Sequence, residues 1–182
     1  DLPDDAAFNT VLVNYFPQAM QSQYANEIEN HYLRREIIAN QVANQVVNRM
    51  GISFVQRLST EMGRSIDDVV RAYWIASELY QAERHFKAIE AWDNQVNAEL
   101  QMRLMAALAR LISRVARGLL KDHAILSDMQ TWQAQYGEPV QDLLSQLPAL
   151  IKVEDHPSVA HSLETLGAEA AIDDEAAQFF AR

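Results

Sequence analysis

Apolar and polar side chains recur with a helical period along residues 33–51, which read LRREIIANQVANQVVNRMG. At 100° per residue, Asn40, Asn44 and Asn48 fall in one stripe with Leu33 and Ile37. A second apolar band covers much of the remaining surface and consists of Ile38, Val42, Val46, Ala39, Ala43 and Met50. Only a narrow wedge with Arg34, Gln41 and Gln45 is left for water. The pattern predicts a central helix that is packed on most of its sides and ends at Gly51.

Amides on a packed helix face need hydrogen-bond partners, because an unsatisfied buried polar group costs about 1–3 kcal/mol. We therefore predict a buried polar network that fixes the register of neighbouring helices. Its members are Asn40, Asn44, Asn48, Asp93 and Asn94. The alternative is a small polar ligand pocket lined by the three helical asparagines, such as an amino-acid effector site. The sequence leaves both interpretations open.

Helical periodicity continues through most of the chain, and strand-type alternation is nearly absent. The predicted fold class is all-α, a multi-helix bundle or array without a sheet. Prolines and glycines delimit the helices, which we expect at residues 4–15, 17–30, 33–51, 53–62, 65–80, 83–92, 97–121, 127–136 and 140–147. Gly137 and Pro139 separate the last two. Residues 1–152 are predicted to form a helical bundle domain, and residues 153–182 a weakly structured acidic C-terminal segment with short helices at most.

The predicted helix at 97–121 has an apolar face and a basic stripe. The apolar face contains Leu104, Leu108, Leu111, Ile112, Val115 and Leu119. The basic stripe lies opposite and contains Arg103, Arg110, Arg114, Arg117 and Lys121. It is either an ordinary solvated face or a docking stripe for an acidic protein surface. Single-stranded nucleic acid would require aromatic residues between the basic ones, and the stripe has none. A protein contact is therefore favoured over a nucleic-acid contact.

The formal net charge of −10 is unevenly distributed along the chain. Residues 1–121 have 13 basic and 14 acidic side chains, whereas residues 122–182 have 2 basic and 11 acidic ones. Because phosphate neutralisation supplies most nonspecific nucleic-acid affinity, no nucleic-acid partner is expected. There is no charged-then-apolar leader and no apolar run of about 18 residues, so we expect no membrane association and a cytoplasmic location. The start at DLPDD, without Met, favours an excised segment.

No catalytic, cofactor-binding or metal-binding residues are predicted. A dinucleotide site needs a glycine-rich turn after a strand, but the five glycines are all at least 12 residues apart. Di-metal sites in helical bundles use Glu three residues before His, and no histidine here has that neighbour, although Glu27 and His31 are four apart. The serines form no nucleophile elbow, and the absence of cysteine excludes thiolate chemistry.

Four strings, taken together, are more specific than a short motif. They are Tyr15-Phe16-Pro17, the central LRREIIANQVANQVVNRMG, RAYWIASELY at 71–80 and AIEAWDNQV at 88–96. Together they resemble the C-terminal helical region of the large bacterial NAD-specific glutamate dehydrogenases, over roughly residues 8–120. The resemblance is strongest at LRREII, NRMG and DNQV.

The resemblance implies a parent enzyme that oxidatively deaminates L-glutamate to 2-oxoglutarate and ammonia with NAD, in a catalytic region elsewhere in a very long chain. This segment is then a helical structural or regulatory module that binds no NAD itself. Its expected partners are the catalytic region of the same chain and further copies in a homo-oligomer. A stand-alone helical module for protein interaction or effector binding is the alternative that the residues leave open.

Overall fold

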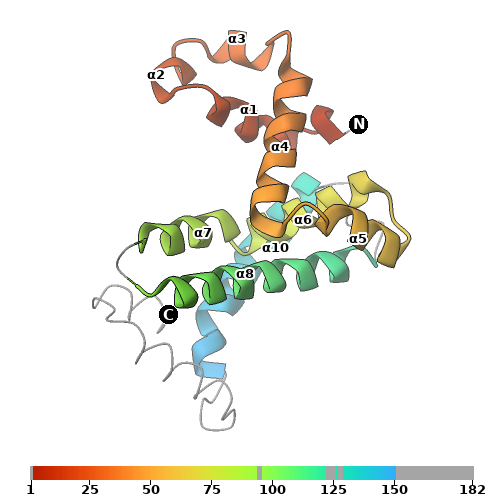
Figure 1. Ribbon diagram of the computed structural model, residues 1–182. Helices are drawn as coiled ribbons and strands as arrows, with labels where there is room; N and C mark the ends of the chain where they lie inside the picture. The colour runs from red at the N-terminus through yellow and green to blue at the C-terminus, as the bar shows by residue number, and fades with distance from the viewer. Residues whose placement is uncertain (1, 94–95, 122–125, 127–128, 151–182) are drawn as a thin grey trace. The chain divides into compact units, whose positions relative to one another are not determined.

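The computed structural model describes residues 2–93, 96–121, 126 and 129–150 (Figure 1). Within these residues every regular element is helical and no strand occurs, which confirms the all-α prediction. The elements are η1 (Leu2–Asp4), η2 (Ala6–Phe8), α1 (Asn9–Tyr15), α2 (Gln18–Gln21), α3 (Ala25–Glu29), α4 (Arg34–Met50), α5 (Phe54–Met62), α6 (Ile66–Leu79), α7 (Ala82–Ala91), α8 (Ala98–Leu119) and α10 (Met129–Leu150).

The described residues divide into two compact units. The first unit draws on residues 1–75 and 113–132, and the second on residues 76–112 and 133–182. Residues 1–152 therefore contain parts of both units. The domain boundary that the sequence predicts at residue 153 lies outside the described residues.

The first unit is built on one side of α4. Ile38, Val42 and Val46 follow each other at a spacing of four residues and are all buried. This apolar ridge explains why α4 packs against η1, α1 and α5. Aromatic pairs extend the core of the unit: Phe8 lies 4.8 Å from Trp74, and Phe54 lies 6.1 Å from Tyr73, between ring centroids.

Arginines fasten the N-terminal segment to the first unit. Arg34 donates to the carbonyl oxygen of Pro3 at 3.0 Å and to Oδ1 of Asn9 at 2.5 Å. Arg35 pairs with Asp4 in an exposed position, whereas Arg71 pairs with Asp5 at 2.7 Å where both side chains are more than four-fifths buried.

Local signals placed several helix ends correctly. Gly63 ends α5 with φ +63°, the left-handed conformation in which glycine is favoured. The hydroxyl of Ser65 accepts a hydrogen bond of 3.0 Å from the backbone N–H of Asp68, so Ser65 caps α6, in agreement with the helix predicted to begin at residue 65. Asn97 caps α8 in the same manner by accepting from the backbone N–H of Glu99 at 2.8 Å.

The second unit joins the end of α6, α7, the first part of α8 and most of α10. Its buried apolar side chains are Ala76, Leu79, Ala82, Phe86, Ile89, Leu100 and Ile112. Gln101 on α8 donates to the carbonyl oxygen of Ile89 at 2.9 Å, which fixes α7 beside α8. Gln133 on α10 donates to the Glu78 carboxylate at 3.3 Å, and Gln141 donates to the carbonyl oxygen of Leu79.

Two expectations about helix boundaries were wrong near the N-terminus. Residues 4–8 form 3₁₀ turns in place of the first part of an α-helix, because the Asp5 carboxylate accepts from the backbone N–H of Ala7 and caps η2. The helix expected at 17–30 is interrupted after α2 at Ser22, a residue type that favours caps and turns over helix interiors.

The expected break at Gly137 and Pro139 was also wrong, because α10 runs through both residues. Proline removes one backbone hydrogen bond from a helix interior and crowds the preceding turn. Here α10 is held to the end of α6 on both sides of Pro139, by Gln133 and by Gln141. These contacts favour one continuous helix over the local preference for a break. The predicted start of a helix at residue 127 lies outside the described residues.

Arg71→Ala is expected to destabilise the chain by about 1–3 kcal/mol, because it leaves a mostly buried Asp5 carboxylate without its charged partner. Arg35→Ala is the matched control, since the Arg35–Asp4 pair is about half exposed and such pairs contribute less than about 1 kcal/mol. Urea unfolding followed by circular dichroism measures both. Equal losses in the two variants would contradict the assignment of Arg71 as the main N-terminal anchor.

Pro139→Ala is expected to stabilise the chain by about 1–2 kcal/mol, because alanine restores a backbone N–H to the interior of α10. Gln135→Ala, at an exposed position of the same helix, serves as the control and should change little. The free energy of unfolding is measured as above. If residue 139 were in a turn, proline would stabilise the protein by restricting the unfolded chain, and Pro139→Ala would lower stability. Such a loss would refute a continuous α10.

Glu78→Gln is expected to raise the stability of the chain at neutral pH. Glu78 is an exposed residue, but neighbouring groups remove part of the water around its carboxylate, and this partial desolvation raises its pKa above the ordinary value; the hydrogen bond from Gln133 lowers the pKa by less. The folded state therefore binds the proton more tightly than the unfolded state. The wild-type free energy of unfolding must then fall as pH rises above the ordinary glutamate pKa of about 4.3.

Glutamine is neutral throughout this range and still accepts from Gln133. Thermal unfolding at a series of pH values from about 4 upward should give a flatter curve for the variant. Its midpoint should match wild type at the acidic end and exceed it at neutral pH. Parallel curves would show that Glu78 does not set this pH dependence.

Candidate interaction surfaces

The side of α4 opposite its buried ridge faces solvent, and it holds the three asparagines. Asn40, Asn44 and Asn48 are all exposed. The prediction of a buried network through them is therefore wrong for this chain. Its other members do not change that result: Asp93 is exposed in the second unit, and Asn94 lies outside the described residues.

The physical reason lies in the choice between two faces of one helix. Burying the ridge of Ile38, Val42 and Val46 requires no hydrogen-bond partners, whereas burying the asparagine stripe requires partners for every amide. Asn44 donates to Oδ1 of Asn40 within the stripe, but this hydrogen bond is long, at 3.5 Å. Most of the hydrogen-bonding capacity of these amides is thus left for water or for another molecule.

The exposed face of α4 is defined here as Ala39, Asn40, Ala43, Asn44, Val47 and Asn48. All six residues are exposed, and the side chain of Val47 has 43% of its surface accessible. No charged residue occurs between Glu36 and Arg49. The sequence held a signal for this face, namely twelve consecutive residues of a helix without a charge.

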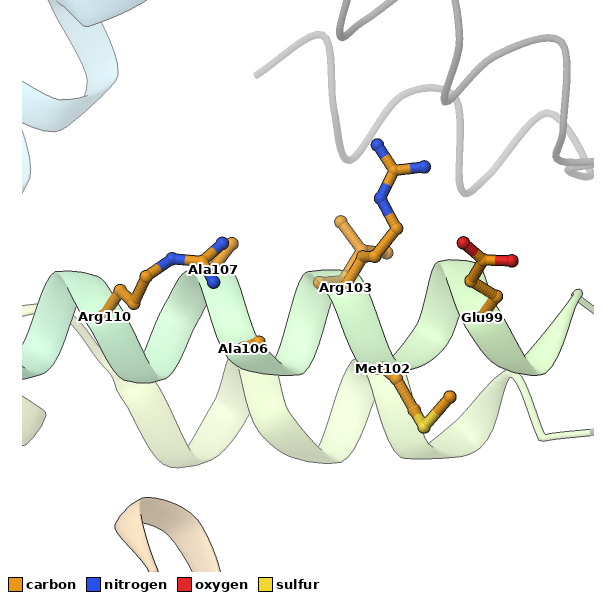
Figure 2. Close-up of a pocket in the computed structure, with 7 residues that line it drawn as sticks. Glu99, Met102, Arg103, Ala106, Ala107 and Arg110 are labelled. Atoms are coloured by element: carbon orange, nitrogen blue, oxygen red, sulfur yellow. The ribbon is translucent and has the colours of Figure 1, made fainter. Parts of the chain in front are cut away.

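A second candidate surface lies on α8 in the second unit. Glu99, Met102, Arg103, Leu104, Ala106, Ala107 and Arg110 line a hollow of about 400 Å³. Figure 2 shows the side chains of Glu99 and Arg103 extending in the same direction from the helix, with Arg110 further along it. All the described lining residues come from one helix, so they form the floor of the hollow and do not enclose it.

The basic residues of the predicted docking stripe have different environments. In the second unit, Arg103 and Arg110 are exposed beside the hollow. In the first unit, Arg114 and Lys121 are exposed, whereas Arg117 is half-buried and lies 2.5 Å from the Glu61 carboxylate. The charge of Arg117 is therefore already neutralised within the chain. A docking role for the other four residues stays a prediction.

The apolar side of α8 is only partly covered. Ile112 and Leu119 are buried as expected, Leu104, Leu108 and Val115 are half-buried, and Leu111 remains 40% exposed. Val115 and Leu119 belong to the first unit, and Leu104, Leu108, Leu111 and Ile112 to the second. Each unit thus takes up a different part of the predicted apolar face.

The candidate chemical groups have local structural roles. His31 accepts a hydrogen bond from the backbone N–H of Leu33 at its Nδ1, at 3.1 Å. Burial, and to a lesser extent the nearby Arg84, lower the pKa of His85, so its imidazole favours the neutral form. In the part of the chain that the structure describes, no three His, Asp or Glu side chains are placed to share a metal ion. No described helix is long and apolar enough to cross a membrane.

The described residues do not fit a dinucleotide. Gly51 and Gly63 both have positive φ at the ends of helices, and neither follows a strand. Gly118 and Gly137 lie within helices, singly and far apart in the sequence. A pyrophosphate needs several backbone N–H groups in a glycine-rich turn, and no such turn occurs in the ranges described above. No chemical step involving NAD is assigned to these residues.

Comparison with known proteins gives the chain its family. Residues 1–182 match the family model described as "Glutamate dehydrogenase, C-terminal". The NAD-specific glutamate dehydrogenase of Halomonas elongata is 37% identical over 131 residues, which is 72% of this chain and 8% of that protein. The enzyme of the same name from Pseudomonas aeruginosa is 34% identical over 151 residues, 83% of this chain and 9% of that protein.

The enzyme of the same name from Mycobacterium tuberculosis is 32% identical over 120 residues, 66% of this chain and 7% of that protein. The chain thus matches less than a tenth of the length of each of these relatives. The match agrees with the resemblance noted in LRREII, NRMG and DNQV. On the match over residues 1–182 and these identities, the chain belongs to the glutamate dehydrogenase C-terminal family.

Proposed function

We propose that this chain is a non-catalytic helical module of a large NAD-specific glutamate dehydrogenase. In the parent enzyme, L-glutamate is oxidatively deaminated to 2-oxoglutarate and ammonia with NAD, in another part of the polypeptide. The module braces that catalytic part and contributes to a homo-oligomer in the cytoplasm. The observation that carries the proposal is a family match over residues 1–182, combined with relatives that are more than ten times as long as the matched stretch.

The described residues support a structural role in two ways. They contain no glycine-rich turn and no metal-ligand cluster, which supports a catalytic site in another part of the parent enzyme. They also include the uncharged exposed face of α4 and four exposed basic residues on and just after α8, which are surfaces suited to contacts with other protein. Both observations support a structural role for this module over a catalytic one.

A stand-alone effector-binding module is less well supported. Its predicted pocket required Asn40, Asn44 and Asn48 to line a cavity, but these residues lie on the outward side of a helix. Ligand pockets are concave and bury most of the ligand surface. An exposed helix face by itself does not provide such an enclosure. The family match also favours a region of a larger enzyme over an independent protein.

The isolated chain is expected to show no glutamate-dependent formation of NADH, followed at 340 nm, because its described residues form no nucleotide site. Deletion of the same region from the full-length enzyme is expected to lower activity at least about tenfold, since misplaced catalytic groups lose rate steeply. The deletion should also alter the oligomeric state, measured by light scattering after gel filtration.

The full-length enzyme prepared in parallel is the control for both measurements. NADH formation by the isolated chain would refute the assignment of chemistry to another region. A deleted enzyme with unchanged activity and assembly would refute the bracing role.

A further inference from the structure

We propose that the exposed face of α4 is the surface by which this module docks onto the rest of its own polypeptide, against an uncharged helix with small side chains and amide or hydroxyl groups. The proposal rests on the proposed function and names the contact surface that the function requires. The face consists of Ala39, Asn40, Ala43, Asn44, Val47 and Asn48, all exposed in this chain.

The charge content of this face distinguishes it from α5, α7, α8 and α10. Exposed charged residues occur along α5 (Arg57, Glu61), α7 (Arg84, Lys87, Glu90), α8 (Arg103, Arg110) and α10 (Glu138, Asp142). In α4, by contrast, residues 37–48 contain no charge at all. A helix that stays in water normally has charged and polar residues on its outer side. The cores of protein interfaces, by comparison, are depleted of charge.

The shape of the face fits a second helix. Ala39 and Ala43 are four residues apart and lie on the same side of α4, with Val47 four residues further on. Small side chains at this spacing let two helix backbones approach to the closer end of the usual 8–10 Å separation. The face extends over residues 39–48 of α4, which gives a contact about 15 Å long at 1.5 Å per residue.

The asparagines specify the chemistry of the partner. Each amide offers two donors and one acceptor, and Asn40 and Asn44 use little of this capacity on each other, at 3.5 Å. An entirely apolar partner would leave these amides unsatisfied at about 1–3 kcal/mol each. The partner helix must therefore present amide or hydroxyl groups opposite them. A charged partner would be desolvated without an ion of opposite sign on the α4 face to receive it.

The length of the relatives favours a partner within the same polypeptide over a second copy of α4. Stable interfaces between separate proteins involve about 20–30 residues on each side, whereas this face offers six. A covalent connection makes docking intramolecular, so a small contact is populated at a high effective concentration. More than nine-tenths of each matched relative lies outside the matched stretch, so ample chain is present to supply the partner helix.

Thiol labelling in the full-length enzyme tests the proposal directly. The present chain contains no cysteine, so Asn44→Cys places a single thiol on the face. Gln56→Cys, at an exposed position of α5 next to Arg57, is the matched control. The modification rate by a maleimide is measured at each peptide by mass spectrometry, in the isolated chain and in the full-length enzyme.

We expect Cys substitution at residue 44 to react at least tenfold more slowly in the full-length enzyme than in the isolated chain, and substitution at residue 56 to react equally in both. Equal rates at residue 44 overturn the proposal. If labelling at residue 44 is also slow in the isolated chain at high protein concentration, a second copy covers the face, and the proposal of a partner within the same polypeptide is overturned.

Ala43→Arg tests whether the contact matters for assembly. Because Ala43 is exposed, the isolated variant should unfold at the wild-type temperature. In the full-length enzyme the same change is expected to release the module, detected as fast labelling at residue 44 and a lower unfolding midpoint, while Gln56→Arg has neither effect. If deletion of the whole region impairs the enzyme but Ala43→Arg does not, the bracing function stands and this docking surface is wrong.

Discussion

The apolar ridge of α4 is the contact from which the first unit is built. Ile38, Val42 and Val46 lie one helical turn apart and are removed from water together. Full burial of such a side chain contributes about 1.5–3 kcal/mol, so the ridge accounts for several kcal/mol in a chain whose net stability is expected to be about 5–15 kcal/mol. Once η1 and α1 rest on this ridge, Arg34 and Arg71 need only fix the N-terminal segment by hydrogen bonds. The same packing turns the opposite side of α4 outward.

Local chemistry was sufficient to predict where most helices begin and end. Ser65, Gly63 and Gly51 act within one turn of their own position, so the residue types alone specify the caps of α4, α5 and α6. Local chemistry was not sufficient to predict which face of α4 is buried. Periodicity identifies the stripes along the helix, but it does not indicate which stripe packs against the core. The aliphatic ridge can be buried without satisfying a single polar atom, whereas the stripe with Asn40 and Asn44 cannot. This difference in polar groups is visible in the sequence, and it favours burial of the aliphatic ridge. The prediction that nearly the whole helix is covered by its own chain did not take it into account.

Long-range contacts decided the remaining features, and these could not be predicted from one sequence. Pro139 is a strong local stop signal, yet α10 continues through it because Gln133 and Gln141 both attach to the end of α6, more than fifty residues earlier. Arg117 belongs by spacing to the basic stripe of α8, yet Glu61 of α5 pairs with it. In both cases a residue distant in sequence determines what a local pattern does in the folded chain. The candidate surfaces were therefore predictable as patterns along one helix, but whether their residues are exposed to a partner was not predictable.

Exposure of large apolar residues is not by itself what marks the docking face. Tyr32 is 94% exposed and Ile52 is 86% exposed, both more than any residue of the α4 face for which an exposed fraction is given. Both lie in short connections, next to His31 and Gly51, and isolated exposed apolar residues are common on protein surfaces. The α4 face differs because its members repeat at helical spacing on a rigid element, include no charge, and combine small apolar residues with amides. A connection can turn a single side chain away from water when the polypeptide around it changes. The face on α4 spans almost three helical turns and cannot do so without pulling Ile38, Val42 and Val46 out of the core, so only another element can cover it.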